Sequence, residues 1–264
     1  MQPEKLTITP LAAFQDNYIW CLTKPDSDAL VVVDPGDADV VVQFARQTQK
    51  QLSCILVTHH HWDHTDGIAA LKQQWPDLQI IGPRYEAERI PGLTQSVQDG
   101  DHVSLPELGL EFEVLHLPGH TLGHIAFYQS STGDYPLLFC GDTLFSAGCG
   151  RLFEGSPEQM HQSLQRLAAL PDNTQVYCTH EYTLANLAFA RAIEPENQAV
   201  IAHQATCQQL RNNQLPTLPS SLAVEKNINP FLRCQLPDLQ RKYPGKSELA
   251  IFTALRHEKD HFKS

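Results

Sequence analysis

Six consecutive residues of the chain carry four side chains that can bind a metal ion. Within this cluster the candidate ligands are His59, His61, Asp63 and His64. Imidazole nitrogens and carboxylate oxygens are the usual ligands of zinc, and of iron or manganese in oxygen-rich sites. The alternation lets a short turn direct His59 and His61 to one point and the following Asp-His pair to another. Four ligands would crowd a single ion that needs an open position, so the cluster predicts two ions.

Three further candidate ligands each follow a predicted strand. They are His120 after the run Leu110 to Leu115, Asp142 after Leu137 to Phe139, and His180 after Gln175 to Cys178. Taken singly, a histidine after a strand is more often a surface or hydrogen-bonded residue than a ligand. Their shared position at strand ends lets all three gather at one edge of a sheet. Five His and two Asp in total are enough for two ions that share one carboxylate.

Asp34, at the end of the β-rich run Ala29 to Val33, carries a hypothesis of another kind. Metal-bound histidines usually donate their second N–H to a carboxylate or a carbonyl, so Asp34 could orient a ligand. A surface turn before Pro35 fits the sequence equally well. The intervening His60 and Trp62 are expected to point away from the metals. We expect the remaining histidines of interest to be ordinary surface or core residues: His102, His116, His124, His161, His203 and His261.

The elements that must position these residues change character along the chain. The first part has short β-rich runs bounded by Pro, Asp, Asn or Gly, as strands and tight turns require. Helical stretches are predicted at Ala38 to Gln49 and from Ser156, which can cap a helix that has Pro157 in its first turn. Beyond about residue 181 only helices are predicted, at Leu184 to Ala192, Gln198 to Leu210 and Glu248 to Arg256. The pattern predicts an α+β domain over residues 1–180 and a smaller helical domain over residues 181–264.

Composition excludes several classes of protein. The chain of 264 residues has 19 Lys+Arg against 30 Asp+Glu, a net charge of −11, which argues against broad nucleic-acid binding. Its apolar runs stop far short of the ~20 residues of a membrane span, and Met1 to Thr7 does not read as a secretory signal. The seven cysteines form no C-x-x-C motif or disulfide framework. We therefore expect a cytoplasmic protein without membrane or nucleic-acid partners, and a monomer.

The segment Thr58 to His64, with the sequence THHHWDH, resembles the signature of the metallo-β-lactamase superfamily. This resemblance implies a four-layer αββα sandwich with a dinuclear metal site at one edge. Within the superfamily the chain is similar, along nearly its whole length, to the hydroxyacylglutathione hydrolase (glyoxalase II) family. The supporting segments are Gln15 to Tyr18, Pro118 to His124, Gly141 to Arg151, His180 to Thr183 and Arg256 to Asp260.

The resemblance implies a role for each matching residue. His59, His61 and His120 would bind the first metal, Asp63, His64 and His180 the second, and Asp142 would bridge them. The two divalent ions would most often be zinc in such sites, with iron or manganese as alternatives that the ligand types do not separate. The glutathione part of the substrate would contact Arg151, Tyr182, Arg256 and Lys259. Phe153 stands where some members have Tyr, so it lacks a hydroxyl that could bond the ligand.

The activity implied is hydrolysis of the thioester S-D-lactoylglutathione to D-lactate and glutathione, the last step of methylglyoxal detoxification. A bridging hydroxide held at Asp142 and Asp63 would attack the carbonyl, and a thiol of pKa about 8.5 leaves without a dedicated acid. Taken without the resemblance, Arg256 to Lys259 would fit a solvated helix end. The alternatives are another enzyme of this fold, such as a persulfide dioxygenase, lactonase, β-lactamase or nuclease, or a non-catalytic metal-binding relative. The acidic charge argues against the nuclease.

Overall fold

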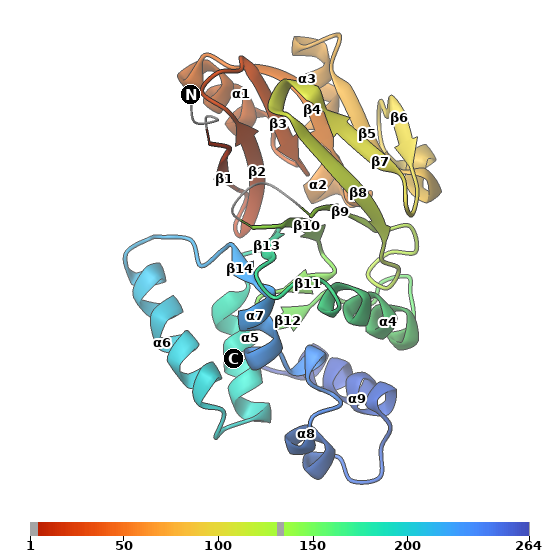
Figure 1. The fold of residues 1–264 in the computed structure, drawn as a ribbon, viewed down its shortest axis with the longest axis vertical. Helices are drawn as coiled ribbons and strands as arrows, with labels where there is room; N and C mark the ends of the chain where they lie inside the picture. Colours follow the sequence, from red (N-terminus) through yellow and green to blue (C-terminus); the bar gives the residue numbers. More distant parts are fainter. Residues whose placement is uncertain (1–4, 131–134, 264) are drawn as a thin grey trace. The chain divides into compact units, whose positions relative to one another are not determined.

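The computed structural model describes residues 5–130 and 135–263. The chain divides into two compact units (Figure 1). The first unit comprises the residues up to His116 together with Gly123–Gly141, and the second comprises Leu117–Leu122 together with the chain from Asp142 onward. Because each unit combines separate stretches of the chain, these units do not test the predicted domain boundary between residues 180 and 181.

A six-stranded mixed sheet forms the first half of the first unit. Its strands lie in chain order, with antiparallel pairing among the first three and parallel pairing from the third onward. They are β1 (Thr7–Ala13), β2 (Asn17–Thr23), β3 (Ala29–Val33), β4 (Gln51–Leu56), β5 (Gln79–Pro83) and β6 (Gln95–Val97). Strand β3 is buried at all five residues, as a strand covered on both faces must be.

Two helices, α1 (Ala38–Thr48) and α3 (Ile68–Gln74), pack against this sheet. Val41 and Ala45, four residues apart on one face of α1, join Ile55 of β4 in a common apolar core. The carboxylate of Asp37 caps α1 by accepting from the N–H of Asp39. Helix α1 connects the parallel strands β3 and β4, and α3 lies in the connection from β4 to β5.

A second sheet in the same unit is antiparallel throughout. It runs in the order β10 (Leu137–Gly141), β9 (Ile125–Gln129), β8 (Leu110–His116) and β7 (His102–Leu105). Strands β9 and β10 are buried at every residue. Three short helical segments complete the unit: α2 (Trp62–Thr65), η1 (Arg84–Arg89) and η2 (Pro106–Leu108).

The second unit is mainly helical. It contains two small antiparallel pairs, β11 (Leu144–Phe145) with β12 (Gly148–Cys149) and β13 (Gln175–Cys178) with β14 (Ser220–Ser221). Its helices are α4 (Pro157–Ala168), α5 (Thr183–Ile193), α6 (Gln198–Asn212), α7 (Leu222–Ile228), η3 (Pro230–Leu232), α8 (Pro237–Lys242) and α9 (Glu248–His261). Helix α4 begins with the predicted Ser156 cap, which Gln159 completes as a reciprocal capping box.

Apolar side chains of the helices form the interior of the second unit. Leu187 and Ala190 of α5 pack with Val200 and Cys207 of α6.

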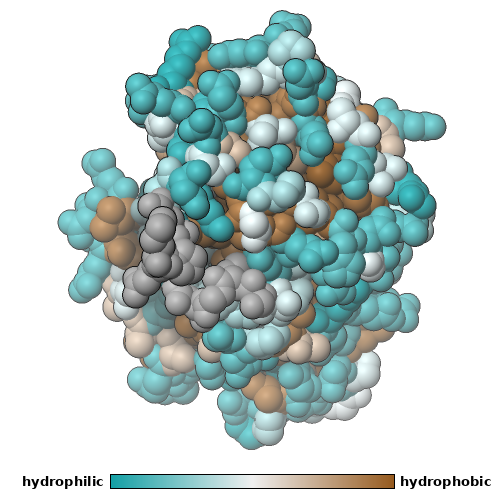
Figure 2. All heavy atoms as spheres, turned by 45° about the horizontal axis from the view of Figure 1, so that its top comes forward, coloured by the Kyte–Doolittle hydropathy of each residue, from teal (hydrophilic) through white to brown (hydrophobic). Residues whose placement is uncertain are grey.

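On the face shown in Figure 2, hydrophilic side chains predominate and hydrophobic areas show between them. All seven cysteines are buried free thiols. Among the described residues, no helix combines the length and the apolar character needed to cross a membrane.

Candidate metal centre

In the first unit, the loop after β4 collects all four candidate ligands of the histidine-rich cluster. His59 is fully buried, and its Nε2 lies 3.0 Å from Nδ1 of His61. The short helix α2 then begins at Trp62 and turns His64 back, so that the rings of His59 and His64 lie 4.1 Å apart. Oδ2 of Asp63 is 3.6 Å from Nε2 of His64 and accepts a hydrogen bond from Asn17.

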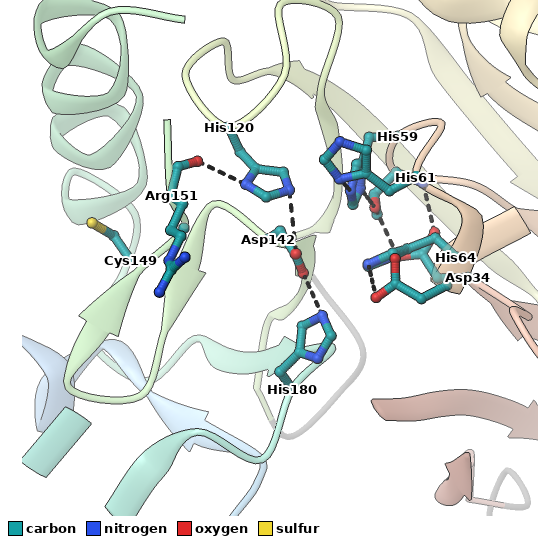
Figure 3. A network of polar contacts seen from close by, with 12 residues as sticks. Asp34, His59, His61, His64, His120, Asp142, Cys149, Arg151 and His180 are labelled. Carbon is teal, nitrogen blue, oxygen red and sulfur yellow. Dashed lines mark hydrogen bonds and ion pairs between the residues drawn. The ribbon is translucent and has the colours of Figure 1, made fainter. Parts of the chain in front are cut away.

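Asp34 holds this loop from the end of β3. Its Oδ1 accepts from the N–H of Thr58 at 2.7 Å, and its Oδ2 accepts from the Thr58 hydroxyl at 2.7 Å. The same Oδ2 lies 3.0 Å from Nδ1 of His64 (Figure 3). Asp34 is 2% exposed, so the alternative of a surface turn does not describe it. Its backbone has a φ of 53°, a left-handed conformation that Asp and Asn tolerate better than most residues.

These contacts determine which ring nitrogens carry protons. A carboxylate only accepts, so the Thr58 hydroxyl must donate to Asp34. The hydroxyl oxygen then accepts from Nδ1 of His59, 3.1 Å away, which leaves the Nε2 lone pair of His59 facing His61. Nδ1 of His64 lies 3.0 Å from Oδ2 of Asp34, and a neutral ring with its proton on Nδ1 presents the Nε2 lone pair toward Asp63, 3.6 Å away.

In the second unit, Asp142 lies between two histidines. Its Oδ2 is 3.3 Å from Nε2 of His120, and its Oδ1 is 3.3 Å from Nε2 of His180 (Figure 3). All three side chains are buried. Nδ1 of His120 lies 2.8 Å from the carbonyl oxygen of Arg151, which can only accept. The proton of a neutral His120 is therefore on Nδ1, and its Nε2 lone pair faces the carboxylate.

The donor sets in both units suit a divalent metal ion. Lone pairs that face each other at these distances repel unless a cation or a proton lies between them. Two ligand atoms ~2.0–2.1 Å from one ion lie about 2.9 to 3.3 Å apart at angles of about 90° to 109°. The His59–His61 distance of 3.0 Å and the two Asp142–histidine distances of 3.3 Å agree with that spacing. Each oxygen of Asp142 therefore faces a different histidine.

Two residues near the cluster have roles that the sequence did not indicate. His124, expected to be an ordinary surface or core residue, is fully buried and its ring stacks on that of His59 at 4.8 Å. Glu86 is also buried and accepts from both the N–H and Nδ1 of His60, at 2.7 and 2.8 Å. It accepts from the N–H of Gly123 as well. The spacing of four residues between His120 and His124 is a sequence signal that could have placed His124 near the site. The sequence around Glu86 contains no comparable signal.

The four residues expected to contact the substrate differ in accessibility. The side chain of Arg151 is exposed, and the ring of Tyr182 is partly exposed and stacks on His180 at 4.7 Å. Lys259 donates to the carbonyl of Ala185 at 3.2 Å. Arg256 is only 4% exposed, and its guanidinium donates within the second unit. Arg151 and Tyr182 are therefore the members of this set with the most surface available to a ligand.

Phe153 lies beside one of the candidate metal ligands. It is 64% exposed, and its ring meets the His120 ring edge-on at 5.3 Å. The exposed ring therefore lies next to a candidate ligand of the second unit.

Comparisons with known proteins cover nearly the whole chain. Residues 17–180 match the family model "Metallo-beta-lactamase superfamily", and residues 181–262 match "Hydroxyacylglutathione hydrolase C-terminus". The chain is 51% identical to a hydroxyacylglutathione hydrolase of Chromohalobacter salexigens over 261 residues, which is 97% of this chain and 100% of the relative. It is 49% identical to that of Photobacterium profundum, with the same coverage. A solved protein described as di-iron-bound has 25% identity and a TM-score of 0.60, covering 86% of this chain and 100% of the other.

Proposed function

The chain belongs to the hydroxyacylglutathione hydrolase family of the metallo-β-lactamase superfamily, and from this premise we propose how its residues hydrolyse S-2-hydroxyacylglutathiones such as S-D-lactoylglutathione. The products are the 2-hydroxy acid and glutathione. The observation that carries the proposal is Asp142, whose two carboxylate oxygens face two different histidines, in a chain about half identical to named hydrolases. The class of enzyme is a thioester hydrolase with the superfamily's fold, which agrees with the α+β class expected from sequence.

We propose two divalent ions per chain, with zinc as the resident metal. His59, His61 and His120 would hold one ion, Asp63, His64 and His180 the other, and Asp142 both. Nitrogen-rich ligand sets favour zinc, although iron and manganese bind the same ligand types. When bound, such ions lower the pKa of a coordinated water and polarise a carbonyl oxygen.

The protein's own groups keep the ligands in the required protonation state. The Asp34 carboxylate lies 3.0 Å from Nδ1 of His64, where it favours a proton on that nitrogen, and through the Thr58 hydroxyl it also fixes the proton of His59. The Arg151 carbonyl does the same for His120. Partners of this kind raise the basicity of a ligand and fix its ring orientation. The protein's own contacts therefore set the protonation state and the orientation of these histidine rings independently of a metal ion.

Departure of the product needs no acid from the protein, because a thiol of pKa about 8.5 leaves as a thiolate. Binding needs local positive charge, because glutathione conjugates are anionic and the chain carries −11. Arg151 and Lys259 would supply this charge, and the partly exposed Tyr182 ring would contact the ligand. Arg256 belongs to the same expected set, and its guanidinium is bonded to the carbonyl of Cys149 and to Asp260.

We further propose that the protein is cytoplasmic and monomeric. Seven buried free thiols suit a reducing compartment. Light scattering of the purified protein tests the monomer.

The experiment that tests the function is a comparison of two substrates. Purified protein is assayed with S-D-lactoylglutathione and, in parallel, with a thioester of the same acyl group that lacks glutathione. We expect fast turnover of the first and little of the second. Absence of turnover for both, in protein that holds about two metals per chain, would reject the substrate and retain the metal site. Reloading chelator-treated protein with zinc, iron or manganese would then identify the metal that restores the highest rate.

A further inference from the structure

A short hairpin in the second unit connects two parts of the candidate metal centre. Strands β11 and β12 pair Leu144 with Cys149 and Phe145 with Gly148, and the turn contains Ala147 at a φ of 55°. Asp142 precedes the hairpin by two residues, and Arg151, whose carbonyl accepts from His120, follows it by two. The position of this hairpin therefore affects both a proposed ligand and the partner of another.

Three buried side chains from the helical region hold one side of the hairpin. Asn229 donates through Nδ2 to the carbonyl oxygens of Phe145 at 3.1 Å and Gly148 at 2.9 Å. Asn186 of α5 donates to the carbonyl of Ser146 at 3.0 Å. Glu225 of α7 accepts from the N–H of Ala147 at 2.7 Å. Asn229 and Glu225 are completely buried, so the backbone groups that they bind have no access to water as a substitute.

These side chains are themselves fixed. Oδ1 of Asn229 accepts from the N–H of Phe231, which determines which end of the amide faces the hairpin. The other oxygen of Glu225 accepts from the Ser220 hydroxyl. Burial raises the pKa of the Glu225 carboxyl, and its hydrogen bonds oppose that rise. The Asn229 and Glu225 side chains also contact each other at 3.3 Å, so they act as one polar network.

Arg256 of α9 holds the far end of the hairpin. Its Nη1 donates to the carbonyl of Cys149 at 2.9 Å and reaches that of Gly150 at 3.5 Å, while Nη2 binds Asp260 at 2.8 Å. The guanidinium also lies 5.3 Å above the ring of Phe231. The guanidinium of Arg256 is therefore engaged in contacts inside the protein.

The end of the hairpin is in direct contact with the ligand residues. The N–H of Gly150 donates to the carbonyl of Thr143 at 3.2 Å. A Cβ on Gly150 would lie 1.9 Å from the carbonyl oxygen of Asp142 and 3.1 Å from Nδ1 of His120. The backbone of Gly150 therefore packs directly against both Asp142 and His120, with no room for a side chain between them.

We propose that Asn186, Glu225, Asn229 and Arg256 form a hairpin clamp, a set of positioning residues that sets the geometry of Asp142 and His120 toward the metals. The clamp residues come from the part of the chain beyond residue 181, so this region contributes to metal binding as well as to substrate recognition. The kinetic side of the inference rests on the proposed function, whereas its effect on metal affinity does not.

The test compares Asn229→Ala and Asn186→Ala with Asn197→Ala. Asn197 is the control, because its Nδ2 also donates to a backbone carbonyl, that of Asn227 at 3.0 Å, which does not belong to the hairpin. Its Oδ1 caps α6, so this variant also controls for a general loss of stability. Zinc affinity is measured by competition with a chelator, and kcat and KM are measured with S-D-lactoylglutathione. We expect both clamp variants to bind zinc ~10–100-fold more weakly and to lose kcat with little change in KM. The control should retain wild-type zinc affinity.

Each outcome decides the inference. If the clamp variants are folded and bind zinc as tightly as the Asn197 variant, the clamp has no positioning role. If Asn229→Ala does not fold, Asn186→Ala alone decides, because it removes a single hydrogen bond from the edge of the network. If the wild-type protein binds zinc but does not hydrolyse the thioester, the proposed function fails, and the zinc affinities still support or reject the clamp.

Discussion

Oδ2 of Asp34 lies 3.0 Å from Nδ1 of His64, and both side chains are shielded from water. Asp34 directly follows β3, and the loop after the neighbouring parallel strand β4 leads into α2, which carries His64. The contact directs the Nδ1 proton of His64 to a carboxylate, and this leaves Nε2 as the metal-binding atom. A single carboxylate beside the ring therefore favours one nitrogen of the ligand for metal binding.

Asp34→Asn should weaken metal binding while preserving the fold. Asn tolerates the φ of 53° and still accepts from the N–H of Thr58, but its amide N–H₂ would donate to Nδ1 of His64. The His64 proton would then move to Nε2, the wrong tautomer for a ligand. We expect a ~10–100-fold loss of zinc affinity and of kcat, measured by chelator competition and steady-state kinetics. Asp37→Asn, which keeps the cap of α1 intact, is the control; equal affinities for the two variants would contradict the role of Asp34.

Asp142→Ala should remove the carboxylate shared by the two metals. The loss should exceed the 10–100-fold typical of residues that only hydrogen-bond a ligand, so we expect at least a ~100-fold fall in kcat. Metal content, measured by atomic absorption after dialysis, should fall with it. Asp172→Ala changes an Asp of the same unit that pairs with Lys226, and it should alter neither quantity. Retention of full metal content and rate by the Asp142 variant would exclude the dinuclear model.

Lys259 should make substrate binding depend on pH. Burial first, and the positive charge of Arg256 second, lower the pKa of Lys259 to about 8. The ammonium is therefore charged below this pH and loses its charge as the pH rises through about 8. For an anionic substrate, KM should rise over that range by about tenfold, because a hydrogen bond to a charged group contributes about 1.5–3 kcal/mol.

Two variants separate this effect from other titrations. Lys259→Arg stays charged throughout this range, so its KM should not change between pH ~7 and ~9. Lys259→Ala should have a raised KM at both values with kcat nearly unchanged, as expected for the loss of uniform binding. A pH-dependent KM that persists unchanged in the Arg variant would assign the titration to another group.

Phe153→Tyr should strengthen substrate binding. The ring is 64% exposed beside His120, so an added hydroxyl needs no rearrangement of the interior. If the hydroxyl bonds the glutathione part of the substrate, KM should fall by about two- to tenfold, since a hydrogen bond contributes about 0.5–1.5 kcal/mol. The measurement is kcat and KM with S-D-lactoylglutathione. An unchanged KM would show that the substrate does not reach this ring.

Strands and helices with strong local patterns were predictable from the sequence. Strands β3 and β13 occupy the predicted runs, and α5, α6 and α9 contain the predicted helices with one to five further residues at an end. The short elements were not predictable. The strands of the β11–β12 hairpin have two residues each, which is too few to show a hydrophobic period. Hydrogen bonds from Asn229 and Asn186, which are distant in the sequence, stabilise the hairpin instead.

The candidate ligands were recognisable for a similar reason. Each candidate ligand follows a strand, and the ends of strands are determined by local sequence. The position of each ligand at a strand end could therefore be predicted from the sequence to within a few residues. Glu86 and Asn229 act through contacts that are remote in the sequence, which no local pattern reveals. The burial of Arg256 was equally hidden from local pattern: without the resemblance its position fits a solvated helix end, whereas packing against Phe231 buries it. The roles of the site residues themselves remain predictions for the experiments above.

The pairing of β13 with β14 limits how this chain can be shortened or recombined. Gln175 and Val176 pair with Ser221 and Ser220, which lie beyond the point where the two family models meet. A fragment that ends at residue 180 would expose this edge of β13, and unpaired strand edges promote aggregation. Exchange of the C-terminal region between relatives must therefore preserve this strand as well as the helices, or the recipient will be recovered as insoluble protein.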